Sequence, residues 1–189
     1  MKRLFIAVPI AERSRMQIIS SFSTNEQARK LPVRWTSVQN LHLTLQFLGN
    51  VEEKRIPVLK QILNRISPPE SPEELAFTGI GAFPNNASPR IIWIGIKPNE
   101  YLQKVQSLIT RDLIRNGFEA DRKKFKPHLT LARVKERAVL SGESLAYLEE
   151  MRAGAVIDNS PLDSVTLFES RLQPGGPVYT PLFETKLEK

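Results

Sequence analysis

The sequence predicts an α+β fold of two pseudo-symmetric lobes, each an antiparallel sheet with helices packed on its outer face, and a functional cleft between the two sheets. One observation behind this prediction is that segments of alternating apolar residues are separated by segments of helical spacing. The other is that equivalent positions recur after 86 to 88 residues in three pairs: Leu4 with Ile91, His42 with His128, and Phe77 with Val165. A nearly constant separation indicates that a strand–helix–strand–helix–strand unit has been duplicated.

The domain organisation follows from the same pattern. No break in charge or composition divides the chain, so we expect a single domain over residues 1–189. Its repeat lobes would span approximately residues 1–84 and 85–189, and exchange of strands between the lobes stays open. A chain of 189 residues that is 41% hydrophobic and 25% charged can bury a real core, which excludes a mainly disordered protein.

The first repeat is outlined by apolar periodicity and by proline and glycine breaks. Alternation predicts strands, and apolar residues three and four positions apart predict amphipathic helices. The predicted elements are a strand over 3–8 ended by Pro9, a helix over 11–29, a strand over 41–47 that stops at Gly49, a helix over 56–66, and a strand over 77–83.

The second repeat shows the same order of elements. They are a strand over 91–96, a helix that opens at Pro98-Asn99 and ends at Gly117, a strand over 128–134, a short helix over 144–151, and a strand over 164–170. A last strand over 179–185 follows the turn sequence Gln173-Pro174-Gly175-Gly176-Pro177.

Composition restricts the chemistry that the chain can perform. No Cys and only two His exclude disulfides, thiolate nucleophiles, zinc fingers and iron–sulfur clusters, and leave almost no ligands for a His-rich metal site. We therefore expect no metal and no cofactor. The 27 Lys and Arg against 20 Asp and Glu give a net charge of +7, which favours polyanions such as nucleic acid or anionic lipid.

The N-terminal apolar run is too short to be a targeting or membrane segment. It covers Leu4 to Ile10, contains Pro9 and lacks a small-residue cleavage site. No other stretch reaches the ~18 apolar residues of a membrane span. We therefore expect a cytoplasmic protein without membrane association. We also expect a monomer, for which the sequence carries no specific signal.

Both histidines lie in the same tetrapeptide, His-Leu-Thr-Leu, which occurs at 42–45 and again at 128–131. In a strand, residues i and i+2 share one face, so each His points to the same side as its Thr while the two leucines pack into the core. If the two strands face each other across a pseudo-twofold cleft, two imidazoles and two hydroxyls converge on one small volume.

This set of side chains suits phosphodiester chemistry. An imidazole with a pKa near ~6.5 can donate or accept a proton at neutral pH, and a pair can divide these roles. Threonine hydroxyls can donate hydrogen bonds to phosphate oxygens. Structural histidines and a two-His metal site are the alternatives, but the duplication disfavours the first and the lack of a carboxylate at ligand-like spacing disfavours the second.

These paired motifs and the residues around them resemble a known family. The paired His-x-Thr-x motifs look like the two-histidine phosphoesterase superfamily, and the flanking residues resemble its RNA 2′,3′-cyclic phosphodiesterase branch, also called 2′-5′ RNA ligase. Those flanks are Arg3-Leu4-Phe5-Ile6-Ala7, Leu45-Gln46-Phe47-Leu48-Gly49, Pro127-His128-Leu129-Thr130-Leu131-Ala132-Arg133 and Gly176-Pro177-Val178-Tyr179.

The resemblance implies metal-independent hydrolysis of an RNA 2′,3′-cyclic phosphate to a 2′-phosphomonoester, with 2′-5′ ligation as the reverse reaction. By the family's pattern His42 would be the general acid and His128 the general base. Thr44 and Thr130 would hold the phosphate. The near-symmetric sequence by itself does not decide between acid and base.

Further residues are candidates for phosphate or RNA binding. Arg133 matches an arginine that the family places near the phosphate, but its parity differs from that of His128, so a regular strand would point it away unless a bulge intervenes. Lys124 and Lys126 belong to the basic run at 122–126 that precedes the second motif. Phe5 and Trp35 are candidate platforms for stacking of a base, whereas Trp93 is expected in the core.

Two other functions stay open. The substrate could be a small cyclic phosphate of nucleotide type, or the chain could be a non-catalytic module that binds RNA ends.

Overall fold

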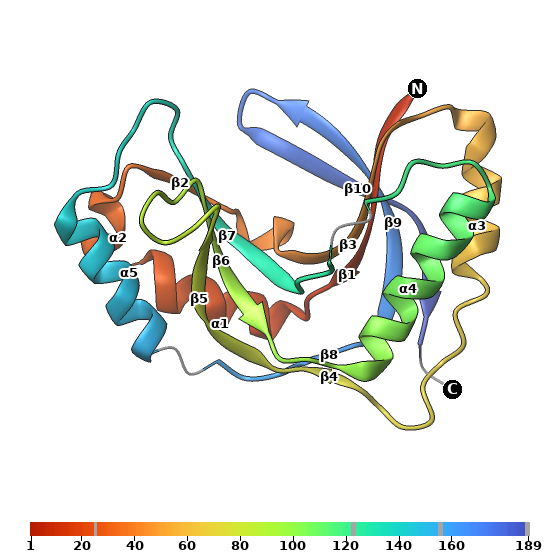
Figure 1. Cartoon of the computed structure of the whole chain (residues 1–189), viewed down its shortest axis with the longest axis horizontal. Coiled ribbons are helices and arrows are strands. Elements are labelled where there is room, and N and C mark those ends of the chain that lie inside the picture. The colour runs from red at the N-terminus through yellow and green to blue at the C-terminus, as the bar shows by residue number, and fades with distance from the viewer. Residues whose placement is uncertain (25, 122–123, 155–156, 188–189) are drawn as a thin grey trace.

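The computed structural model describes the whole chain apart from residues 25, 122–123, 155–156 and 188–189. Its main sheet is antiparallel and has the strand order β10-β9-β1-β3-β7-β6-β5, with β2 pairing with β7 (Figure 1). The strands are β1 (Lys2–Pro9), β2 (Val33–Trp35), β3 (His42–Val51), β5 (Phe77–Phe83), β6 (Ile91–Ile96), β7 (His128–Val134), β9 (Ser164–Gln173) and β10 (Gly176–Lys186). A separate two-stranded sheet joins β4 (Glu74–Leu75) to β8 (Ser160–Pro161).

The main sheet opens into two lobes at the boundary between β3 and β7. These two strands share a single register pair, Leu43 opposite Leu129, whereas β1 pairs with β3 along its whole length. One lobe therefore holds β10, β9, β1 and β3, and the other holds β7, β6, β5 and β2. Because the strands diverge on either side of this pair, the His-Leu-Thr-Leu strands form the seam between the lobes.

Each lobe takes its third repeat strand from the other repeat. The β1–β3 pair of the first repeat is completed by β9, which follows the second repeat's β6 and β7 along the chain. The β6–β7 pair is completed by β5, which belongs to the first repeat. The two sequence repeats therefore cannot separate without breaking the β1–β9 and β5–β6 ladders.

Helices cover the outer faces of both lobes (Figure 1). On one side lie α3 (Ile56–Leu63) and α4 (Glu100–Arg115), and on the other lie α1 (Glu12–Ser23), α2 (Glu26–Lys30) and α5 (Gly142–Gly154). The helix α4 is capped at its N-terminus by Asn99, whose side-chain oxygen accepts a hydrogen bond from the Leu102 N–H at 2.7 Å. Buried apolar side chains from these helices and from both halves of the sheet make one continuous core.

Several element boundaries differ from the sequence prediction. The expected helix over 11–29 is divided into α1 and α2, since the Ser23 and Thr24 hydroxyls donate to the carbonyls of Ile19 and Ser20 at the end of α1. Gly49 does not end its strand, because it adopts a φ of 65° inside β3, which then continues to Val51. The short strand β2 had no predicted counterpart. The helix over 56–66 ends at Leu63, and β9 and β10 are longer than expected.

Candidate active site

The two His-Leu-Thr-Leu motifs meet at the seam between the lobes. Leu43 stands opposite Leu129 in an antiparallel pair, and each leucine lies between the His and the Thr of its own motif. Both leucines are fully buried, so the other four side chains share the opposite, cleft-facing side. The two imidazoles and the two threonine hydroxyls therefore lie on one face of the seam, around the Leu43–Leu129 contact.

Both imidazoles are held in the same way. Nδ1 of His42 donates to the Asn40 carbonyl at 2.7 Å, and Nδ1 of His128 donates to the Lys126 carbonyl, also at 2.7 Å. A carbonyl oxygen can only accept, so the proton resides on Nδ1 in each neutral ring. In both neutral rings Nε2 is then the nitrogen whose lone pair is able to accept a proton.

Burial lowers the pKa of both rings, to different extents. Loss of hydration lowers the pKa of His42 to about 4, and the positive charges of His128 and Arg133 add to this, against the Asn40 hydrogen bond. The pKa of His128 is also lowered by burial, with contributions from Lys126 and Arg133. Both imidazoles are therefore neutral near pH 7 when the cleft is empty.

Aromatic side chains from β1 and β10 support His42. The rings of Phe5 and Tyr179 lie 4.8 Å and 5.2 Å from the His42 ring, centroid to centroid. Phe5 was expected to stack on a base, but only 3% of it is exposed, because Phe168 also stacks on it at 5.2 Å. The structure thus gives Phe5 a packing role that fixes the His42 ring.

His128 has its own aromatic surroundings, from β5 and β6. Its ring lies 5.0 Å from Phe83 and 6.1 Å from Trp93. The expectation that Trp93 is a core residue was wrong, because Trp93 pairs with Thr130 and so stands on the cleft face. Its ring lies flat on Gly81, where an added Cβ would come within 2.3 Å of it. The Lys126 ammonium sits 4.3 Å from the centre of the Trp93 ring.

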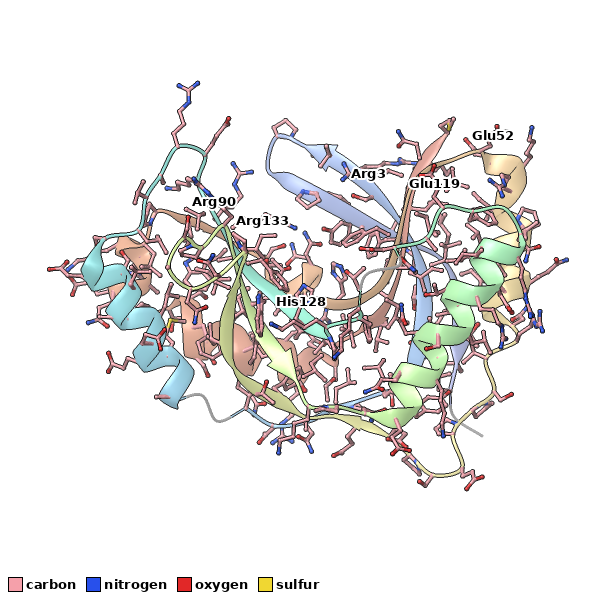
Figure 2. All side chains as sticks on the ribbon, viewed as in Figure 1. Arg3, Glu52, Arg90, Glu119, His128 and Arg133 are labelled. Carbon is pink, nitrogen blue, oxygen red and sulfur yellow. The ribbon has the colours of Figure 1, made fainter. Side chains whose placement is uncertain are left out.

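Arg133 reaches the cleft face through a bulge in β7. Thr130 stands opposite Trp93 and Ala132 opposite Ile92, so Leu131 is the extra residue. This shift reverses the parity and turns Arg133 to the same side as His128. The Arg133 guanidinium accordingly lowers the pKa of both histidines. Arg133 and His128 are labelled in Figure 2.

Trp35 and Lys124 were also predicted to contact RNA, and the structure places one of them toward the core and the other at the surface. Trp35 pairs with the buried Ala132, which puts its side chain on the core side of the sheet rather than in the cleft. The structure therefore does not offer Trp35 as a platform for a base. Lys124 is exposed in the segment before β7, and residues 122 and 123 of the same basic run lie outside the described part of the chain.

Sequence reasoning missed three residues of the cleft. Tyr179 was noted only as part of a flanking motif, yet burial raises the pKa of its hydroxyl while Arg133 and Arg3 oppose this rise. Phe47 projects from β3 opposite Phe5 and is 63% exposed. Arg34 stands directly opposite Arg133. The spacing of about 86 residues could have indicated Phe47, because it is the repeat counterpart of Arg133.

Within the described residues no group of three or more His, Cys, Asp or Glu side chains is arranged to hold a metal ion. The same part of the chain contains no helix that is long and apolar enough to cross a membrane.

Comparison with known proteins gives consistent matches over the whole length. The model of the family described as LigT-like phosphoesterases matches the chain twice, over residues 8–93 and 94–179, which confirms the duplicated, two-lobed fold class. An RNA 2′,3′-cyclic phosphodiesterase of Archaeoglobus fulgidus is 32% identical over 180 residues, which are 95% of this chain and 97% of that protein. A protein with the same name from Thermotoga maritima is 30% identical over 190 residues, with coverages of 98% and 96%.

Solved structures also match over nearly the whole chain. The crystal structure of TT0787 from Thermus thermophilus has a TM-score of 0.77 at 27% identity and covers 98% of this chain and 97% of that one. Escherichia coli LigT complexed with 3′-AMP has a TM-score of 0.74 at 25% identity, with coverages of 100% and 99%.

Proposed function

Because the chain belongs to the LigT-like phosphoesterase family, we propose that it hydrolyses the 2′,3′-cyclic phosphate at the end of an RNA chain to a 2′-phosphomonoester. The observation that carries this proposal is the pair of imidazoles on one face of the seam, each with Nδ1 bonded to the backbone carbonyl two residues before it. The curated relatives named RNA 2′,3′-cyclic phosphodiesterase support the choice of substrate.

The reaction needs one proton donor and one proton acceptor on opposite sides of the phosphorus. Nε2 of neutral His128 takes a proton from water, whose oxygen forms the new P–O bond. The P–O3′ bond breaks, and protonated His42 gives its Nε2 proton to the departing 3′ oxygen. The phosphate stays on the 2′ oxygen, and the two histidines return to their starting states when a proton passes from His128 to His42 through solvent.

The low pKa of His42 means that His42 acts as the proton donor only when substrate is bound. An empty cleft leaves His42 neutral, since its pKa of about 4 lies well below pH 7. A phosphate anion beside the ring favours the charged imidazolium and raises the pKa on binding. His42 therefore becomes an acid only when a phosphodiester is bound.

Hydroxyl and guanidinium groups stabilise the phosphorane-like transition state. Within the described part of the chain, neither the Thr44 nor the Thr130 hydroxyl has a hydrogen-bond partner, so both are free to donate to non-bridging oxygens. Arg133 adds positive charge on the same face. The exposed Lys126 and Lys124 add positive charge in the segment before His128.

The same groups can act in ligation. If the 5′-hydroxyl of a second RNA attacks the cyclic phosphate in place of water, a 2′-5′ bond forms without ATP, and the reverse reaction cleaves it, because each imidazole can either give or take a proton. We also propose that the protein acts as a cytoplasmic monomer, which light scattering and cell fractionation would test.

The proposal is tested with a short RNA that ends in a 2′,3′-cyclic phosphate, in the presence of EDTA. We expect hydrolysis by the unmodified protein and a product that retains its phosphate on the 2′ oxygen. His42→Ala and His128→Ala should each lower kcat by about 10²- to 10⁴-fold while the circular dichroism spectrum and melting behaviour stay near those of the unmodified chain. Normal turnover in either variant would refute the two-histidine mechanism.

A second substrate separates the acid from the base. Sulfur in place of the 3′ oxygen makes a leaving group that departs without protonation. If His42 is the acid, this substrate restores turnover in His42→Ala but not in His128→Ala. The opposite pattern would exchange the two roles.

A further inference from the structure

We propose that Arg34, together with Arg133, forms a second phosphate subsite that binds the phosphodiester immediately 5′ of the terminal cyclic phosphate. The ligand is thus an oligonucleotide end rather than a single cyclic nucleotide. This inference rests on the proposed function and extends it, because the histidines and threonines account only for the scissile phosphate.

The two guanidiniums are neighbours on the cleft side of the sheet. Arg34 on β2 stands directly opposite Arg133 on β7, and side chains of opposed residues share a face. The bulge at Leu131 turns this face to the side of His128. Arg34 is exposed between the inward-facing Val33 and Trp35, so its side chain extends from the sheet surface. Cα atoms of opposed residues are about 5 Å apart, which places Arg34 one strand further from the reacting phosphate than Arg133.

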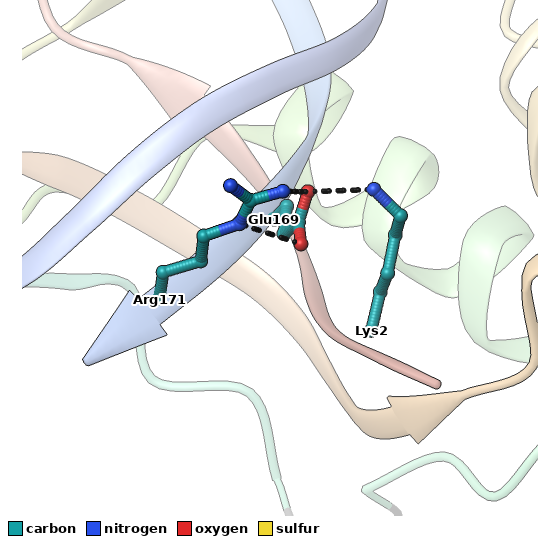
Figure 3. A network of polar contacts seen from close by, with 3 residues as sticks. All are labelled: Lys2, Glu169 and Arg171. Atoms are coloured by element: carbon teal, nitrogen blue, oxygen red, sulfur yellow. Dashed lines mark hydrogen bonds and ion pairs between the residues drawn. The ribbon is translucent and has the colours of Figure 1, made fainter.

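This pair has no acidic partner within the described residues. Like charges directly opposite each other destabilise an antiparallel pair unless an anion lies between them. On β1 and β9, by contrast, two cations share one carboxylate. Lys2 and Arg171 contact the Glu169 carboxylate at 2.9 Å and 3.0 Å (Figure 3). The uncompensated charge at Arg34 and Arg133 therefore indicates an anionic ligand.

The repeat symmetry shows that the charge pair belongs to one lobe only. The counterpart of Arg133 in the first repeat is Phe47, which is 63% exposed. Arg3 and Arg90 are counterparts of each other, and they lie on the two sides of the cleft in Figure 2. The side of the cleft that carries Arg34 and Arg133 therefore has a charge pair at this position that the first repeat lacks.

Three substrates isolate the contribution of the second phosphate. They are a nucleoside 2′,3′-cyclic phosphate, the same nucleoside with an added 5′-phosphate, and a dinucleotide that ends in the cyclic phosphate. The 5′-phosphate occupies the position of the preceding phosphodiester without a second base. We expect kcat/KM of the unmodified protein to be about tenfold or more higher for the second and third substrates than for the first, as is typical of a charge-assisted contact.

Arg34→Gln should remove this preference and leave the first substrate within about twofold of the unmodified rate. With the dinucleotide, the slope of log kcat/KM against log salt concentration should become shallower by about 0.7, the value for one phosphate contact in a single strand. Arg34→Lys should restore part of the preference. Arg29→Gln, at an exposed position of α2, removes the same charge elsewhere and should change none of these values.

Two results would overturn the inference. One is an equal loss on all three substrates in Arg34→Gln, and the other is an unchanged preference in that variant. If the unmodified protein hydrolyses the first substrate in either case, the proposed function stands and only the second subsite fails. If it hydrolyses none of the three, the proposed function itself fails.

Discussion

Burial of the neutral His42 ring makes the stability of the fold depend on pH. The ring has a pKa of about 4 in the folded protein, against about 6.5 in an unfolded chain. Below pH 6.5 the unfolded state therefore binds more protons than the folded state, and the free energy of unfolding falls as the pH drops toward 4. Above pH 6.5 this effect is absent.

Replacing His42 by Gln removes this titration while leaving an amide of comparable size at the seam. Linkage between the two pKa values predicts that the His42 ring lowers the free energy of unfolding by about 2 kcal/mol between pH 7.5 and pH 5. That is a large part of the 5–15 kcal/mol that is typical of a domain. The carboxylates and His128 titrate in both proteins, so the difference between the two pH dependences isolates His42.

Urea unfolding of the unmodified protein and of His42→Gln at the two pH values measures this difference. We expect the unmodified protein to lose about 2 kcal/mol more than the variant on acidification. NMR titration measures the pKa of each imidazole independently. The chain has two His, so the imidazole signal that is missing from His42→Gln belongs to His42. Equal losses in the two proteins, with both imidazole signals titrating near ~6.5, would refute the picture of a desolvated neutral ring.

Three further substitutions test the surroundings of the site. Thr130→Val should lower kcat for the cyclic phosphate by about 10²-fold with little change in the free energy of unfolding, because it removes only a donor to the transition state. Gly81→Ala should destabilise the fold by about 1–3 kcal/mol and shift tryptophan fluorescence, since its Cβ would enter the Trp93 ring. Gln46→Leu should destabilise by about 1–3 kcal/mol in urea unfolding, because Gln46 bonds both the N–H and the carbonyl of Asp121 at 3.2 Å and 3.1 Å.

Each of these substitutions has an outcome that contradicts its reasoning. A normal kcat in Thr130→Val would remove the hydroxyl from the phosphate site. An unchanged stability in Gly81→Ala would show that the Trp93 ring does not rest on that strand. A neutral Gln46→Leu would mean that the segment before His128 is anchored by other contacts.

The amino-acid sequence by itself determined most of the elements and the central pair of histidines. Alternation and helical spacing are local properties, so the strands at 3–8, 77–83, 91–96 and 128–134 could be predicted close to their observed bounds. The repeated tetrapeptide likewise identified His42, His128 and their threonines, because the i and i+2 positions share a face in any strand.

The tertiary structure decided which side chains meet across the seam. The pairing of Leu43 with Leu129 brings the two His-Leu-Thr-Leu motifs side by side, and it joins residues that are 86 positions apart. The bulge that turns Arg133 into the cleft is visible only against β6. The exchange of β5 and β9 between lobes is another contact of this long-range kind.

The aromatic residues show most clearly which features the sequence determined and which the tertiary structure decided. From the sequence, Phe5 and Trp35 were candidates for stacking, and Trp93 was assigned to the core. In the structure Phe5 is covered by Phe168, Trp35 faces the core, and Trp93 stands beside His128. Whether an aromatic ring is open to a ligand depends on neighbours from distant strands and on bulges that reverse parity. Local periodicity carries no information about either, so only the folded chain determines it.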